Sequence, residues 1–280
     1  MASATAADYG WIRSSSAGFG YALDLGYTLA LVRGVRPDEL LGMAGAEPRG
    51  MSAGLGELIE QHQERLIEAE YWDETILAGA CTVEGEGGDW TLALVLGGDL
   101  GSPLLMETLS AGTRAVSHSS NGGKPMHFFH WYEHGELRTM FERPQVRSGS
   151  TPDELNAVMR EVGLDPTDDE APGVDRKAAV FALTERLTGV RVTDELLALA
   201  EFLTGDVPEE PAGSWESETS TSRMRTASAP SCSFGGINSD TRRLRPRARA
   251  ERPRPQRQSD VHPQFFVHLA VRRGQYLPRS

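Results

Sequence analysis

Four histidines near the middle of the chain carry side chains that can ligate a metal: His118, His127, His130 and His134. Imidazole nitrogens bind zinc, and three of them converging on one hairpin would form a site. Residues 126–133 are predicted to form a strand, in which side chains alternate between two faces. His127 then points away from His130 and His134, and no carboxylate is identifiable that would orient His118. We therefore predict no metal site and keep His118, His130 and His134 as the metal-ligand candidates.

Other residue types that could do chemistry lack the spacing that the chemistry needs. Ser110 and Ser117 lie near the histidines, but no Gly-x-Ser-x-Gly nucleophile turn is present. The glycines of residues 97–102 follow a predicted strand, yet the lysine of a phosphate-binding loop is missing. The acidic residues 165–173 lack the ligand alternation of a calcium loop. We assign no catalytic residue and predict no cofactor.

Cysteine and tryptophan residues are interpreted mainly as structural. Cys81 and Cys232 are the two cysteines of the chain, too few for a disulfide framework, which favours a reducing, cytoplasmic compartment. Cys81 is predicted to be a small core residue of an apolar strand. Trp90 and Trp131 are expected on the sheet, buried on one side, although an exposed tryptophan would mark a contact site. Arg33, Trp90 and Trp131 are the candidate contact residues.

The hydrophobic pattern of the first two hundred residues alternates between strand and helix signals. Six strands are predicted at residues 25–33, 75–83, 90–96, 113–119, 126–133 and 136–142. Helices are predicted at residues 37–45, 55–71, 102–109, 151–162, 175–187 and 194–202, several of them with Pro, Asp or Glu in the first turn. This pattern predicts an α+β fold: a mostly antiparallel sheet of about five or six strands, helices on one face and a helical C-terminal layer.

Apolar positions of these elements define an expected core. We expect seven of them to be largely buried, namely Leu31, Leu92, Leu94, Val116, Phe129, Leu183 and Leu187. Truncation of such a leucine to alanine typically costs about 2–5 kcal/mol of stability.

Five stretches of the chain match a known family pattern in order: residues 31–39, 90–93, 109–117, 135–142 and 185–197. The most specific are Leu-Ser-Ala-Gly-Thr within residues 109–117 and Arg-Leu-Thr-Gly-Val within residues 185–197. On these residues the chain resembles domain of unknown function 6461, a family of uncharacterised actinobacterial proteins, over roughly residues 9–203. Because that family has no assigned activity, the resemblance implies a module of this size and transfers no catalytic residue.

Charge divides the chain into two parts. Residues 1–205 contain 15 basic and 32 acidic residues, a formal charge of −17, whereas residues 206–280 contain 13 arginines, no lysine and 8 acidic residues. The second part is rich in Pro, Ser and Arg without apolar periodicity, which predicts disorder. We therefore predict an acidic domain at 1–205 and a disordered basic tail at 206–280. The tail is either a nucleic-acid-binding arm or a frameshift-like extension encoded by GC-rich DNA.

Composition also bears on the compartment. The mean hydropathy is −0.37 and the longest apolar runs span only a handful of residues, so no transmembrane helix is expected. The N-terminal sequence MASATAADYG has neither the basic nor the apolar region of a secretion signal, and none is expected.

The leading functional hypothesis is a cytoplasmic, non-enzymatic protein-interaction or regulatory module. A charge of −17 repels nucleic acid and favours a cationic protein partner. One form of this hypothesis is an immunity-type or antitoxin-type protein that neutralises a basic effector. Two alternatives stay open: an enzyme whose site one sequence does not reveal, and nucleic-acid contact through the arginine-rich tail.

Overall fold

The computed structural model describes residues 3–68, 75–100, 102–122, 128–167 and 173–208. All of them fall within one unit of the chain, Met1–Met224. The predicted basic tail lies outside the described residues from residue 209 onward, as do the centre of the acidic 165–173 segment and His127.

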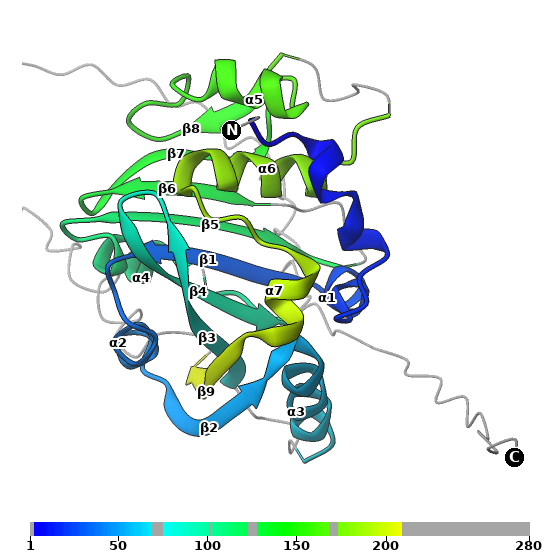
Figure 1. Ribbon diagram of the computed structural model, residues 1–280. Coiled ribbons are helices and arrows are strands. Elements are labelled where there is room, and N and C mark those ends of the chain that lie inside the picture. Colours follow the sequence, from blue (N-terminus) through cyan, green and yellow to red (C-terminus); the bar gives the residue numbers. More distant parts are fainter. Residues whose placement is uncertain (1–2, 69–74, 101, 123–127, 168–172, 209–280) are drawn as a thin grey trace, which may run out of the picture. The chain divides into compact units, whose positions relative to one another are not determined.

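The described residues form one antiparallel sheet of nine strands, in the order β2-β9-β3-β4-β1-β5-β6-β7-β8 (Figure 1). The strands are β1 (Tyr27–Arg33), β2 (Glu47–Ala53), β3 (Thr75–Gly85), β4 (Gly88–Leu96), β5 (Arg114–Ser120), β6 (Phe129–Glu133), β7 (Glu136–Arg143), β8 (Val146–Ser148) and β9 (Glu201–Pro208). The six predicted strands correspond to β1, β3, β4, β5, β6 and β7. The expected sheet of five or six strands was too small, because β2, β8 and β9 were not predicted.

Each missed strand has a weak sequence signal. β2 has the sequence EPRGMSA and is exposed at all but one residue, so it shows no buried stripe. β8 is only three residues long. β9 follows a helix that was predicted to run to residue 202, but the helix ends at Leu199 because Ala200 has an extended backbone. Residues 201 and 202 are therefore strand, contrary to the prediction.

The helices connect these strands and pack on the sheet. They are the 3-10 helix η1 (Ala6–Arg13) and the α-helices α1 (Phe19–Leu25), α2 (Pro37–Met43), α3 (Gly54–Glu68), α4 (Pro103–Leu109), α5 (Asn156–Val162), α6 (Arg176–Thr188) and α7 (Asp194–Leu199). Several begin at side-chain caps: Asp175 accepts hydrogen bonds from two backbone amides of α6, and Thr193 from one of α7. In Figure 1, α6 and α7 lie in front of the sheet and α4 lies behind it.

Helices cover both faces of the sheet, which corrects the expectation of helices on one face. Leu29 and Leu31 of β1 belong to a buried cluster shared with α1, α3, α5, α6 and α7. Ala30 and Val32 belong to a second cluster, shared with α2 and α4. A strand whose successive residues are all apolar requires cover on both faces, because side chains alternate along it.

The predicted core is confirmed. All seven residues named for it are at most 9% exposed. At the centre of the larger cluster, the Phe181 ring contacts five other rings, with centroids 4.6–6.2 Å away; these belong to Tyr9, Trp11, Phe19, Tyr27 and His118. The aromatic cluster ties η1, α1, β1 and β5 to α6.

In the part of the chain that the structure describes, no helix has the length and apolar character needed to cross a membrane.

Candidate functional site

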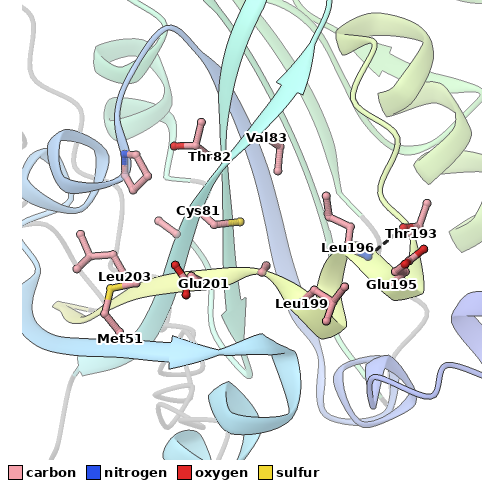
Figure 2. A pocket seen from close by; sticks show the side chains of 13 residues that line it. Met51, Cys81, Thr82, Val83, Thr193, Glu195, Leu196, Leu199, Glu201 and Leu203 are labelled. Carbon is pink, nitrogen blue, oxygen red and sulfur yellow. Dashed lines mark hydrogen bonds between the residues drawn. The ribbon is translucent and has the colours of Figure 1, made fainter.

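An open groove of about 790 Å³ lies between β3, β9 and α7. Its lining is mainly apolar, with two glutamates; it includes Met51, Ala80, Cys81, Thr82, Val83, Glu195, Leu196, Leu199, Glu201 and Leu203. Figure 2 shows Met51 and Leu203 at one end and Leu196 and Glu195 at the other, with Cys81 between them. Met51 and Leu199 are 54% and 73% exposed, so large apolar side chains face solvent here.

The groove exists because β9 separates from β3 part-way along it. β9 lies between β2 and β3, and its pairing with β3 reaches only to Ala80, opposite Leu203. The first two residues of β9, Glu201 and Phe202, pair with β2 alone. Four successive β3 residues, 80–83, line the groove. Because neighbouring side chains of a strand point to opposite faces, four in a row reach one groove only at a strand edge.

Helix α7 forms the opposite wall and is anchored at its first residue. The Asp194 carboxylate accepts hydrogen bonds from the hydroxyls of Ser15 and Ser16 and from two backbone amides, Ser16 N at 2.8 Å and Ala17 N at 3.2 Å. Burial alone would raise the pKa of this carboxyl, but these hydrogen bonds outweigh it and hold the pKa at about 2. The wall of the groove is thereby tied to the N-terminal segment.

We expect Asp194→Asn to lower the free energy of unfolding by about 1–2 kcal/mol at pH 7, because hydrogen bonds to a charged group contribute about 1.5–3 kcal/mol and solvent screens this partly exposed site. The Asp194 pKa in the folded chain lies below its usual value of 3.8. The carboxylate therefore stabilises the fold fully above about pH 4, and this contribution is lost as the pH falls towards 2. Urea unfolding at several pH values measures it.

The neighbouring Glu195 provides a matched control, since it is exposed and forms no ion pair among the described residues. Glu195→Gln should leave the urea midpoint unchanged at every pH. If Asp194→Asn also left the urea midpoint unchanged at pH 7, Asp194 would not anchor α7.

The one thiol of the groove lining, that of Cys81, is poorly suited to act as a nucleophile. Burial raises the pKa of the Cys81 thiol to about 12, so the thiol stays protonated near neutral pH and is a weak nucleophile. No histidine, lysine or arginine is among the described lining residues, and such a group would be needed to lower that pKa. The prediction that Cys81 is a small core residue is confirmed, as the residue is 5% exposed.

The candidate metal ligands His118, His130 and His134 do not converge. In the β5–β6 ladder His118 pairs with Phe129 and His130 pairs with Ser117, which places the two imidazoles on opposite faces of the sheet. His134 lies in the turn after β6 with a φ of 53°. Across the described residues, no group of three or more His, Cys, Asp or Glu side chains is arranged to hold a metal ion.

His118 instead belongs to the aromatic cluster. Its Nδ1 lies 3.3 Å from the Tyr27 hydroxyl, and burial lowers its pKa to about 3. The cavity that it lines measures about 20 Å³, which is too small for a substrate.

Comparison with known proteins assigns the family. A family model described as a family of unknown function (DUF6461) matches residues 2–212, three quarters of the chain. The chain belongs to this family. The match confirms the resemblance and includes all of β9, so the DUF6461 domain extends beyond the predicted end at residue 203. Neither a curated protein nor a solved structure matches the chain.

Two of the three candidate contact residues are buried in this DUF6461 domain. Trp90 is 1% exposed and donates its indole N–H to the Glu86 carbonyl at 3.0 Å. Trp131 is 3% exposed, and the guanidinium groups of Arg114 and Arg138 lie 5.9 Å and 5.6 Å from the centre of its ring system. Neither indole presents a face to a partner, because each is covered by the domain itself.

The third contact candidate, Arg33, is half-buried at the end of β1. It does not line the groove. Its carbonyl accepts a hydrogen bond from Thr113, which is a structural contact. The three candidates therefore do not form one surface of the DUF6461 domain.

Sequence reasoning missed the groove residues and also His62. His62 is 5% exposed on α3, neither ring nitrogen has a hydrogen-bond partner, and burial lowers its pKa to about 4. The available signal was its spacing from Leu55 and Leu58, which places it on the same buried helix face. For the groove, the available signal was the pair Leu196 and Leu199 of α7, whose apolar character had been assigned to packing. Leu196 is half-buried, but Leu199 is 73% exposed.

Proposed function

We propose that this DUF6461 protein is a non-enzymatic protein-interaction module, and that the groove beside β3 is where its acidic domain binds a basic protein. The observation that carries the proposal is an open, mainly apolar groove whose only charged lining residues, within the described part of the chain, are two glutamates. Protein contacts of this kind combine an apolar centre with a polar rim.

The electrostatics of the groove favour a cationic partner. Glu195 and Glu201 are exposed and form no ion pairs among the described residues. Nearby cations are already engaged: Arg36 pairs with Asp38 and Arg49 pairs with Asp206. The groove therefore keeps a negative potential, within a region of the chain that carries a formal charge of −17.

A binding role also agrees with the chemistry of the groove, in which the Cys81 thiol is held protonated and no histidine, lysine or arginine is among the described lining residues. One concrete form of the proposal is an immunity-type or antitoxin-type protein that occupies a basic effector. Residues 1–205 would then supply the recognition surface, and the arginine-rich tail would contribute no essential contact.

The proposal is tested by cross-linking the full chain to its neighbours in the native cell. We expect a basic protein to be cross-linked, and its yield to fall at least tenfold for the double variant Glu195→Lys/Glu201→Lys. Electrostatic steering also predicts that complex formation slows as the salt concentration rises.

The double variant Glu60→Lys/Glu64→Lys is the matched control, because it makes the same change of net charge on exposed positions of α3. It should retain the cross-linked protein. Equal loss in both double variants, or an acidic protein as the main cross-linked species, would refute the groove as the site for a basic partner.

A further inference from the structure

The outer edge of β3 carries backbone groups that face the groove. In β4, which pairs with β3 in a hairpin, the Asp89 carbonyl accepts a hydrogen bond from the Gly34 amide. The backbone groups of Asp89 therefore point towards β1 and away from β3. The partner of Asp89 in the β3–β4 ladder is Glu84. Because backbone groups alternate along an antiparallel pair, Val83 bonds to β4, whereas Thr82 and Glu84 direct their amide and carbonyl groups outward.

These outward groups have no strand beside them in the described part of the chain. β9 stops pairing with β3 at Ala80, and no backbone hydrogen bond outside the ladders involves Thr82 or Glu84. Both residues are exposed. An open edge of this kind is a ready template for an added strand, and residues 81–84 offer about 13 Å of it.

The groove supplies side-chain walls on both sides of this edge. Cys81 and Val83 face the side of α7, with Leu196 and Leu199 beyond them, while Thr82 faces the opposite side (Figure 2). A strand laid along the edge would direct alternate side chains towards α7. The groove is therefore shaped for an extended segment rather than for a helix or a small molecule.

We propose that the basic partner binds by strand addition: an extended segment of the partner pairs with residues 81–84 of β3. This inference rests on the proposed function and specifies its binding mode. The segment carries β-branched or aromatic side chains at alternate positions, which pack on Leu196 and Leu199. Lysine or arginine side chains of the same segment meet Glu195 and Glu201, which are the charged groups of the groove.

The test begins with a library of random twelve-residue peptides displayed on phage and selected on the full chain at low salt. We expect the selected peptides to be rich in lysine or arginine and in alternating β-branched or aromatic residues. Binding should fall at least tenfold for Leu199→Asp, and should be unchanged for Val146→Asp, which alters an equally exposed apolar residue of β8.

The decisive measurement is an N-methyl scan of one selected peptide. Methylation removes the amide proton, so in strand addition every second position should lose at least tenfold in affinity while the intervening positions stay within twofold. On the protein, the exchange of the Thr82 amide should slow at least tenfold when the peptide binds.

A pair of variants at Thr82 tests the same point from the protein side. Thr82→Pro removes the outward amide proton and should abolish peptide binding, whereas Thr82→Val keeps the proton and should bind normally. If Thr82→Pro fails to fold, the N-methyl scan alone decides.

The possible outcomes separate this inference from the proposed function. Peptides that bind in the groove without a period-two methylation pattern overturn strand addition but leave the interaction role standing. A tenfold gain in peptide affinity after deletion of residues 213–280 would assign the edge to this chain's own C-terminal segment, and a dimer dissociated by the peptide would assign it to a second copy. Either result overturns the inference. By contrast, if no basic protein were cross-linked to the unmodified chain, the proposed function itself would be refuted.

Discussion

Replacement of Phe181 by alanine is expected to lower the free energy of unfolding by about 3–5 kcal/mol. Phe181 is 1% exposed and its ring contacts five other rings from η1, α1, β1 and β5. The variant loses the apolar burial of the ring, creates a cavity where four elements meet, and removes aromatic contacts that each contribute about 0.5–1.5 kcal/mol. Urea unfolding followed by tryptophan fluorescence measures the loss.

The same variant should change the ionisation of His118, whose ring centroid lies 4.6 Å from that of Phe181. Burial holds the His118 pKa at about 3, and water entering the new cavity would raise it by at least one unit towards 6.5. An NMR titration of the imidazole resolves this shift. Phe181→Leu should lose less stability than Phe181→Ala, and Val146→Ala, at a site that is 69% exposed, should lose less than about 0.5 kcal/mol. Equal stability of the alanine and leucine variants would contradict the central position of this ring.

A chain that ends after Gly205 is expected to be at least 3 kcal/mol less stable than one that ends after residue 212. The shorter chain lacks Asp206, Val207 and Pro208, the end of β9 that pairs with β3. Asp206 also forms an ion pair with Arg65, whose side chain is 6% exposed, and removing one member of a buried pair costs about 3–5 kcal/mol. Urea unfolding of both chains measures the difference.

The chain ending after residue 212 should match the full chain within about 1 kcal/mol, since it retains all of β9. Asp206→Asn in the full chain separates the ion pair from the ladder: it removes the charge but keeps the strand pairing, and should account for a part of the loss. If the two truncated chains unfolded at the same urea concentration, β9 would not be integral to the domain beyond Gly205.

Strong local patterns made much of the fold predictable. The strands β1 and β4 and the starts of α2, α6 and α7 lie within two residues of their predicted positions, whereas α5 begins at Asn156 and not at the predicted residue 151. The continuous apolar runs of β1 and β4 also imply helices on both faces of the sheet, because a strand without polar alternation is covered on both sides. The expectation of helices on one face disregarded this. β2 and β9 were missed since their pairing is non-local: the exposed strand β2 is held by β9, about 150 residues later in the chain.

The candidate site was less predictable for the same reason. The groove depends on where β9 leaves β3, which no property of residues 80–83 or of α7 alone encodes. The histidines and tryptophans were candidates because of their residue type alone. Burial determines whether such side chains can reach a ligand or a partner, and His118, Trp90 and Trp131 are all within the core. Alternation along the predicted strand 126–133 was the argument against a shared metal site, but the faces of His118 and His130 required the register of the β5–β6 ladder.

The position of β9 between β2 and β3 has a consequence during protein synthesis. β2 ends at Ala53 and β9 begins at Glu201. At about 5–20 residues per second, the ribosome needs roughly 7–30 s to add the intervening residues. For most of that time, once β3 has also been added, the growing chain holds two strand edges whose common partner has not yet been made. A chaperone that covers these edges would therefore act before Pro208 is added, and the domain closes only with the last strand of its sheet.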